Sequence, residues 1–376
     1  MTYRSVIHRI QDVGLYLTCI LLPIKLTLGY LGLVPLIVAW TLEHWRSIPQ
    51  RLQQLPSSGK YFAALFFSLA LLAPFGINPT HSIAHFGTLF FFPLTILCIA
   101  SLPLSKHHTV IHLLVVGTAA ACLLRLCEFI FQIEFPIIGA VSQSGQLALT
   151  IFVALAWLRQ AKKQIFWNLV VSALIVSVFI LNLKRGPWLG VAVMTAILLM
   201  RKRALYAAFF VSAATLLAFL IPPIYERLAS SVNHFFIAGG RSEIWKIGLE
   251  LISTYPLGIG FDNAGYLREF SAEIPKNLKH FHSNILNILV EGGWLCCYLY
   301  LAFVITLAKE MQQRATTWAT DIYSQYPLYL GLFASILAGL VEYNFGDSTV
   351  VNLFYIILGL VYAAPTIPTS DTAPTT

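Results

Sequence analysis

The chain has 376 residues, of which 58% are hydrophobic and only 11% are charged. Charged residues make up about a quarter of an ordinary soluble domain, so this composition excludes that class. Apolar runs long enough to cross, or nearly cross, a hydrocarbon core of about 30 Å recur along the whole chain. The sequence therefore predicts an all-α, polytopic membrane protein.

Twelve membrane-spanning helices are predicted, and several of them are short. One long polar segment, residues 222–281, separates the ninth from the tenth and is predicted to be partly helical. We expect residues 1–364, including this segment, to form a single membrane domain. The tail at 365–376 is rich in Pro and Thr and is expected to be disordered. The predicted helices cover residues 12–24, 27–42, 61–75, 82–101, 109–132, 142–158, 165–183, 187–200, 204–221, 283–308, 326–343 and 350–364.

Lys and Arg residues decide the predicted orientation, because short loops that carry them stay cytoplasmic. With the N-terminus inside, most of the 24 Lys and Arg residues fall in cytoplasmic segments. The formal net charge of +8 then reflects topology rather than nucleic-acid binding, and segment 222–281 is extracytoplasmic. Arg4 and Arg9 precede the first apolar run, but no small-residue cleavage site follows, so we expect no cleavable signal peptide. All six cysteines lie in apolar runs, which predicts neither disulfides nor a cysteine metal site.

Lys184 and Arg185 lie at the outer junction between two predicted helices, where positive charge runs against the general trend. Pro187 suits the first turn of the helix that follows. The exposed amides of a helix N-terminus favour an anion, and a lipid-linked pyrophosphate would suit this environment. The alternative is that both side chains reach outer-leaflet headgroups.

Arg241 follows Gly239 and Gly240 and opens a predicted amphipathic helix over residues 241–252. The polar segment holds as many acidic as basic residues, so any anion site in it must come from particular arginines. An arginine at a helix start is unfavourable for the helix dipole, which indicates a partner outside the helix. A salt bridge to a nearby carboxylate is the alternative.

His282 lies where the polar segment ends and the tenth helix begins. Asn284, Asn287 and Glu291 share one face of that helix and should point into protein or a wet cavity. A neutral imidazole can accept a proton from a hydroxyl group, although a lone histidine is often structural.

Acidic side chains inside or beside the predicted helices give further candidates. Arg125 and Glu128, three residues apart on the fifth helix, can pair with each other or face a cavity. Glu342 and Asp347 flank the outer end of the eleventh helix. Carboxylates at membrane depth are functional candidates, with helix capping as the alternative for Asp347.

Four motifs carry a resemblance to a known family. Their order, their spacing and their placement on one side of the membrane resemble the bacterial O-antigen ligase and polymerase superfamily over nearly the whole chain. The motifs are Arg185-Gly186-x-Trp188-Leu189-Gly190, Gly239-Gly240-Arg241-x-x-x-Trp245, Pro256-Leu257-Gly258-Ile259-Gly260, and His282-Ser283-Asn284 ahead of Glu291-Gly292-Gly293.

Within that superfamily, ligases resemble the pattern His, then Asn, Ser or Gln, nine residues, Gly, two residues, and Gly, Thr or Tyr. His282, Ser283 and Gly293 match this pattern, whereas Cys296 departs from its last position. Polymerases often carry paired Arg-x10-Gly motifs in two outer loops. No outer arginine is followed by glycine at that spacing, which favours a ligase; those compared are Arg185, Arg227, Arg241 and Arg268.

The resemblance implies a GT-C-like membrane glycosyltransferase of the bacterial inner membrane. Its donor would be a glycan on undecaprenyl pyrophosphate and its acceptor, for a ligase, lipid A-core at the periplasmic face. We expect Arg185 and Arg241 to hold the pyrophosphate and His282 to orient or deprotonate the acceptor hydroxyl, with inversion at the anomeric carbon. No Asp-x-Asp signature lies in the outer segment, so we expect no metal, nucleotide or other cofactor. Further substrate contacts are expected from Lys184, Ser283, Asn284, Glu342 and Asp347.

Three alternatives stay open. An O-antigen or exopolysaccharide polymerase, or a protein glycosyltransferase, would use a similar site with another acceptor. A transporter or flippase of lipid-linked glycans would bind pyrophosphate without turnover and would need cationic residues along a path through the bilayer. A structural subunit of an envelope complex would tolerate alanine at these positions.

Overall fold

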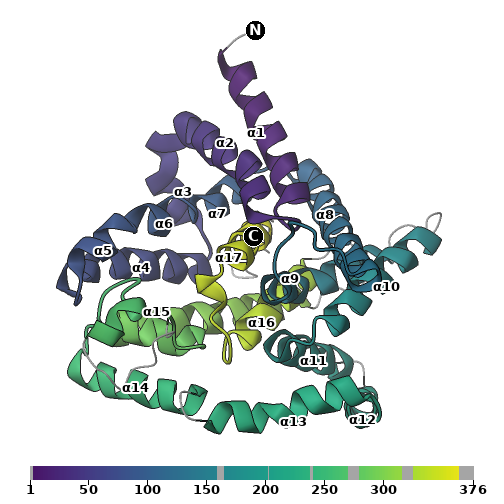
Figure 1. Cartoon of the computed structure of the whole chain (residues 1–376). Coiled ribbons are helices and arrows are strands. Elements are labelled where there is room, and N and C mark those ends of the chain that lie inside the picture. The colour runs from purple at the N-terminus through teal and green to yellow at the C-terminus, as the bar shows by residue number, and fades with distance from the viewer. Residues whose placement is uncertain are drawn as a thin grey trace, which may run out of the picture.

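The structure, a computed structural model, describes residues 3–158, 165–201, 203–237, 240–269, 279–315 and 325–363. Every regular element among these residues is helical, which confirms the predicted all-α class (Figure 1). The predicted tail from residue 365 lies outside the described residues. The α-helices are α1 (Tyr3–Leu21), α2 (Leu26–His44), α3 (Ile48–Gln54), α4 (Ser57–Leu72), α5 (Pro79–Ala84), α6 (Phe86–Phe90), α7 (Leu94–Ala100), α8 (Leu104–Phe131), α9 (Ala140–Leu158), α10 (Ile165–Leu181), α11 (Arg185–Met200), α12 (Ala204–Leu220), α13 (Pro222–Phe236), α14 (Arg241–Thr254), α15 (Asn284–Ala315), α16 (Tyr326–Ala338) and α17 (Ser348–Tyr362). The 3-10 helices are η1 (Trp45–Ser47), η2 (Ala73–Phe75), η4 (Ala264–Glu269) and η5 (Asn344–Gly346).

The helices support a polytopic membrane protein, but the predicted count of twelve spans is not confirmed. Five helical stretches of the described chain are long and apolar enough to cross a membrane, and a sixth is possible if α12 and α13, bent by 95°, count as one span. Several predicted runs instead form apolar helices of only 13 to 17 residues, such as α10, α11, α16 and α17. The run at 82–101 is divided among α5, α6 and α7.

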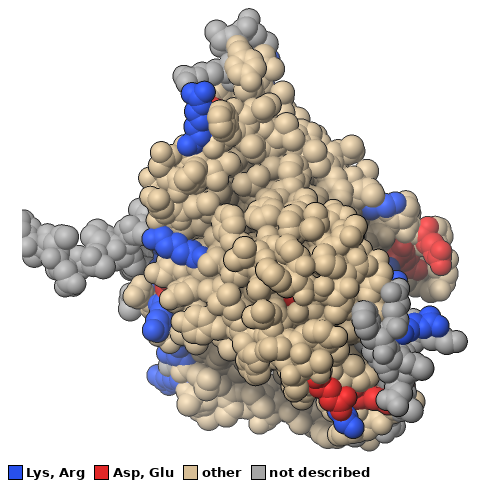
Figure 2. Space-filling model, turned by 90° about the vertical axis from the view of Figure 1, so that its left-hand side faces the viewer, with Lys and Arg blue, Asp and Glu red and all other residues tan. Residues whose placement is uncertain are grey.

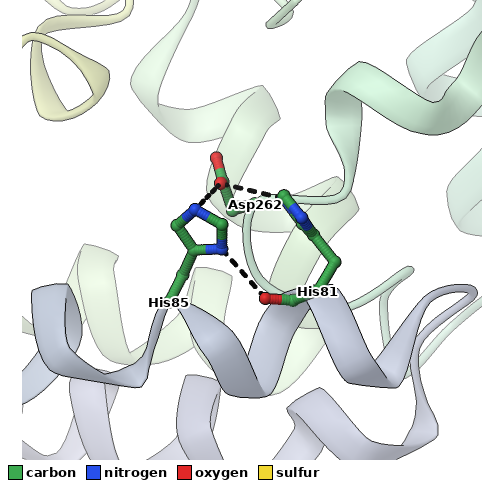
Figure 3. Close-up of side chains that lie close together, drawn as sticks. All are labelled: His81, His85 and Asp262. Atoms are coloured by element: carbon green, nitrogen blue, oxygen red, sulfur yellow. Dashed lines mark hydrogen bonds and ion pairs between the residues drawn. The ribbon is translucent and has the colours of Figure 1, made fainter.

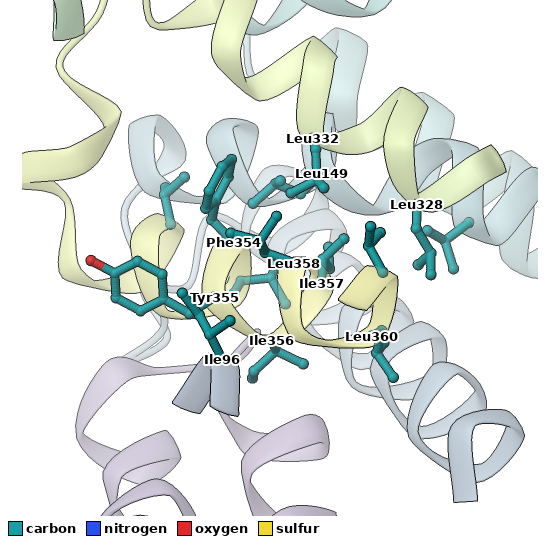
Figure 4. Packing of buried hydrophobic residues seen from close by; sticks show 14 of the residues in the cluster. Ile96, Leu149, Leu328, Leu332, Phe354, Tyr355, Ile356, Ile357, Leu358 and Leu360 are labelled. Carbon is teal, nitrogen blue, oxygen red and sulfur yellow. The ribbon is translucent and has the colours of Figure 1, made fainter. Parts of the chain in front are cut away.

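Helix α17 occupies the centre of the molecule. From Asn352 to Val361 each of its side chains is buried, and the helix packs against α7, α9 and α16. Figure 4 shows Phe354 and Ile357 of α17 close to Leu149 of α9. A helix that is apolar all round is the expected occupant of such a position.

The outer surface of the molecule is also largely apolar. Figure 2 shows a broad face that is almost entirely free of Lys, Arg, Asp and Glu, with most of the visible charged side chains toward its margins. Leu71 and Phe75 are both 71% exposed near the end of α4. Exposed apolar area on this scale suits contact with lipid tails.

A break in α15 receives the backbone of the segment that follows α14. Gly293, with φ 69° and ψ −171°, interrupts the helix. The Ile259 and Gly260 amides donate to the carbonyl oxygens of Val290 and Glu291 at 2.8 and 3.0 Å. Gly258, at φ +89°, lies so close that a Cβ there would stand 2.4 Å from the Glu291 oxygen. The Pro256–Gly260 and Glu291–Gly293 motifs are therefore two halves of one backbone contact.

Small residues also bring α11 against α16. A Cβ at Gly190 would lie 2.0 Å from the Ala334 oxygen, and one at Gly186 would lie 2.6 Å from Cγ of Glu342. Glycines four residues apart on one helix face allow this close approach between helices in a membrane.

Polar contacts join helix ends at one extreme of the bundle, and the polar segment lies at the other. At one end, the Ser58 hydroxyl donates to the Glu310 carboxylate at 2.6 Å and lies 2.9 Å from the Tyr362 hydroxyl, joining the start of α4 to α15 and α17. At the other end, α13 and α14 of the long polar segment run along one edge of the molecule beside α12 and α15 (Figure 1).

We expect Gly258→Ala to destabilise the protein by roughly 1–3 kcal/mol, because a side chain would occupy a left-handed conformation and also meet the α15 backbone. The measurement is thermal unfolding of the purified protein in detergent. Gly265→Ala is the matched control, since a Cβ there meets nothing within 4 Å. Equal unfolding temperatures for the two variants would contradict this account of the break.

Candidate functional site

A cavity of about 590 Å³ opens where helix ends meet beside the polar segment. Lining residues come from the start of α9, the start of α11, α13, α14, the turn before α15 and the connection between α16 and α17. The cavity brings together five residues that the sequence singled out and two that it did not. Its charged and titratable lining residues are Lys184, Arg227, Arg241, His280, His282, Glu342 and Asp347, with Tyr343 beside them.

A tight turn presents two histidines to the cavity. Phe281 is fully buried among apolar residues of α14 and α15. Its carbonyl accepts from the Trp245 indole at 2.9 Å, and its amide donates to the Asn287 side chain at 3.3 Å. His280 and His282 flank it, with ring centroids 4.3 Å apart, and His282 adopts φ +52°. Burial of Phe281 therefore fixes both imidazoles on the cavity side.

Arg241 pairs with a carboxylate from a distant part of the chain. One of its guanidinium nitrogens lies 3.0 Å from Oε1 of Glu342, and both residues line the cavity. The structure thus shows the alternative considered for Arg241, an ion pair with a carboxylate, and that carboxylate is itself a predicted substrate contact. A guanidinium has five N–H donors, so this pair leaves others for a ligand.

Arg185 lies beside the cavity without lining it. Its guanidinium donates to the Ser230 hydroxyl at 3.0 Å, and within the described chain its buried Nε has no hydrogen-bond partner. Arg227 lines the cavity and donates from Nε to the Leu183 carbonyl at 3.0 Å. The start of α11 thus faces two arginines of the polar segment, Arg227 and Arg241, whose charges act on Arg185.

Both cavity histidines are held in the neutral form at pH 7. Burial lowers the pKa of His280 to about 4, with the neighbouring His282 contributing and Glu342 opposing. Burial, followed by the charge of Arg241, lowers the pKa of His282. Nδ1 of His282 is buried and has no hydrogen-bond partner among the described residues. Each ring can therefore offer a lone pair to a proton donor near neutral pH.

Ser283 and Asn284 do not line the cavity. Both are buried, and Oγ of Ser283 accepts from the Leu286 amide at 3.4 Å at the start of α15. The Asn284 side chain accepts from the Phe345 amide at 3.2 Å. Ser283 thus caps α15 and Asn284 ties it to the segment between α16 and α17, so the expectation of direct substrate contact by these two residues has no support from the geometry.

Asp347 was considered both as a site residue and as a helix cap, and its position suits both. Its carboxylate accepts from the Thr349 and Val350 amides at 3.0 and 3.3 Å and so caps α17, while the residue also lines the cavity. Arg125 and Glu128 form an ion pair away from the cavity. Arg125 also donates to Gln143 at 3.0 Å, which ties α8 to α9.

Sequence reasoning did not select Arg227 or His280 as site residues. Arg227 entered only a spacing comparison, and its position follows from the bend between α12 and α13, which no motif reveals. His280 had a usable signal, because it stands two residues before His282 with a large apolar residue between them. Such an alternation places both polar side chains on one side of an extended turn.

Comparison with known families gives one match. Residues 171–301 match the family model described as O-antigen ligase. This match confirms the resemblance to the O-antigen ligase and polymerase superfamily, and it covers the chain from α10 into α15, including Arg185, Arg241 and His282. The superfamily implies a membrane glycosyltransferase-type activity on lipid-linked glycans. No curated protein matches the chain.

The neutral histidines predict a pH dependence of stability. Between pH 6.5, the ordinary pKa of histidine, and about 4, the unfolded chain binds a proton at His280 that the folded chain does not. The free energy of unfolding should therefore fall as the pH is lowered through this window. We expect His280→Gln to flatten the decline in unfolding temperature, measured from pH 7.5 to 4.5.

His112→Gln is the control, because His112 is exposed on α8 away from the cavity. An unchanged pH profile in His280→Gln would show that this imidazole is not buried in the neutral form.

Proposed function

We propose, from the superfamily placement of residues 171–301, that the protein is an O-antigen ligase. It would transfer a glycan from undecaprenyl pyrophosphate to lipid A-core at the periplasmic face of the bacterial inner membrane. The observation that supports this most is the cavity itself, where Arg227, Arg241 and Lys184 surround a neutral His282. Cationic donors suit a pyrophosphate leaving group, and a neutral imidazole suits an acceptor hydroxyl.

The donor's pyrophosphate would lie against the arginines. Guanidinium groups bind phosphate oxygens through paired, charge-assisted hydrogen bonds. Arg241, at the start of α14, and Arg185, at the start of α11, would stabilise the charge that develops as the bond between the anomeric carbon and the pyrophosphate oxygen breaks. The amides at these two helix starts add favourable partial charge.

The acceptor hydroxyl would approach from the side of His282. Its oxygen bonds to the anomeric carbon from the face opposite the leaving group, which inverts the configuration. The hydroxyl proton passes to the neutral imidazole of His282. The bond between the anomeric carbon and undecaprenyl pyrophosphate breaks, and the pyrophosphate stays bound to the arginines. A general base of this kind contributes typically about 10²–10⁴-fold to a rate.

A polymerase of the same superfamily is the second candidate, because the same donor site with another glycan as acceptor would extend a polymer. Matches at His282, Ser283 and Gly293 favour a ligase, while Cys296 departs from the ligase pattern. A transporter of lipid-linked glycans is less well supported, because the cationic residues of the cavity gather at one end of the bundle rather than along a path through it.

We expect Arg241→Ala and His282→Ala each to lower the rate of glycan transfer by about 100-fold or more, and Arg185→Ala to lower it as well. The assay mixes purified protein, lipid-linked glycan and lipid A-core, and follows product with time. Arg268→Ala is the matched control, since Arg268 is an exposed arginine of the same polar segment that does not line the cavity. Wild-type activity in all three site variants would remove the site assignment while leaving the family placement intact.

The proposed chemistry uses no metal ion, because arginines take the place of a cation on the pyrophosphate. We therefore expect transfer to continue in EDTA at a temperature where the protein stays folded. Product formation with and without chelator gives the measurement. Strict dependence on added divalent ions would overturn this version of the mechanism.

A further inference from the structure

Three potential metal ligands meet beside the α15 break, outside the cavity described above. His81 and His85 lie four residues apart at α5, and Asp262 lies on the segment that follows the Pro256–Gly260 contact (Figure 3). Nε2 of His81 is 3.1 Å from Oδ2 of Asp262, and Nε2 of His85 is 3.6 Å from the same oxygen. The three ligand atoms lie within 4.8 Å of one another.

The other nitrogen of each imidazole already has a hydrogen-bond partner. Nδ1 of His85 lies 2.9 Å from the carbonyl oxygen of His81, so it must carry the proton and donate. Nδ1 of His81 lies 3.1 Å from the Tyr266 hydroxyl, which can accept from it. When both Nδ1 atoms donate, each Nε2 directs a lone pair toward the Asp262 carboxylate, and either a bound cation or protonation of the rings satisfies the arrangement. Hydrogen bonds of this kind orient the histidines that ligate metals in proteins.

Neighbouring contacts fix the two segments before any ion binds. The Ser82 hydroxyl of α5 donates to the Phe261 carbonyl at 2.7 Å, and the Ile77 amide donates to the Ile259 carbonyl at 2.8 Å. Asp262 itself adopts a left-handed backbone conformation, with φ +59°. The ligands thus belong to segments that are already joined, so an ion would not have to organise them.

The distances suit a tetrahedral ion. Ligand bonds of about 2.0–2.1 Å place neighbouring ligand atoms about 3.3 Å apart, which falls between the two observed separations. We propose that His81, His85 and Asp262 form a binding site for a divalent transition-metal ion, Zn²⁺ being the most suitable probe. Two imidazoles favour zinc and its neighbours over Mg²⁺ or Ca²⁺, which prefer oxygen ligands.

The site would act as a cross-link. It would join α5 to the segment between α14 and η4, adding to the backbone contacts already present. His85 and Asp262 also line a second cavity of about 420 Å³, which shares His280 and Tyr343 with the first, so the fourth position of the ion would face that space. The proposal does not depend on glycan transfer, because it concerns the stability of the fold beside the site.

The test uses full-length protein in detergent, stripped with EDTA and carrying no polyhistidine tag. Addition of Zn²⁺ should give one tightly bound equivalent by titration calorimetry and should raise the unfolding temperature, whereas Mg²⁺ should do neither. Co²⁺ should give the visible absorption bands of a tetrahedral site. His85→Gln and Asp262→Asn should weaken zinc binding by more than the about 10–100-fold typical for loss of a supporting hydrogen bond.

The matched control is His108→Gln with His112→Gln. These residues have the same four-residue spacing on α8, are both exposed, and belong to no group of three ligands within the described part of the chain. Zinc binding that survives in the triad variants but is lost in this control would overturn the proposal. So would wild-type protein that binds no equivalent of Zn²⁺ and shows no cobalt spectrum.

Discussion

The backbone contact between Pro256–Gly260 and the break in α15 holds together the end of the molecule that carries the polar segment. Gly258 and Gly293, both with positive φ, allow two stretches of backbone to lie against each other where a Cβ would collide. Gly260, also with positive φ, allows the same segment to approach Gly76. On one side of this contact α14 is drawn against α15, which buries Phe281 and sets the histidine turn. On the other, the Asp262 segment is held against α5. Both the cavity and the histidine–aspartate triad therefore depend on this contact, where the glycines have no room for a side chain.

The electrostatics of the cavity link its two kinds of residue. Arg241 supplies positive charge to a site that we propose for an anion, and the same charge helps to lower the pKa of His282. Burial acts in the same direction on His280 and His282. A histidine that must accept a proton has to be neutral beforehand, so a cationic and partly buried setting prepares it for that role. The same positive charge would thus favour both the binding of an anion and the neutral form of His282 that base catalysis needs.

Much of this arrangement could be predicted from the sequence, because it follows from local pattern. The apolar runs located the helices, and the departures from the positive-inside trend located Lys184 and Arg185. The count of spans was less predictable, since an apolar run at 82–101 does not reveal that it divides into three short helices. The partner of Arg241 could not be identified either, because Glu342 lies 101 residues away and only packing brings them together.

The role of each residue within a motif was harder to predict from the sequence than the position of the motif in the fold. Ser283 and Asn284 follow His282 directly, yet Ser283 accepts from an amide of the α15 start and Asn284 accepts from the Phe345 amide of the segment between α16 and α17. Gly293 forms part of the ligase-like pattern but is required by the backbone break. In the proposed metal-ligand triad only the four-residue spacing of His81 and His85 is visible in the sequence, because Asp262 lies 181 residues from His81.

The pair between Arg241 and Glu342 means that the resting cavity already contains an anion, supplied by the protein itself. Chloride or a single carboxylate in solution offers no more charge than Glu342 does and gains little by replacing it. A pyrophosphate, with several oxygens spread over two phosphorus atoms, carries more negative charge than one carboxylate and would offer more acceptors to the arginines that line the cavity. Glu342 would therefore make the cavity bind polyvalent anions in preference to simple ones.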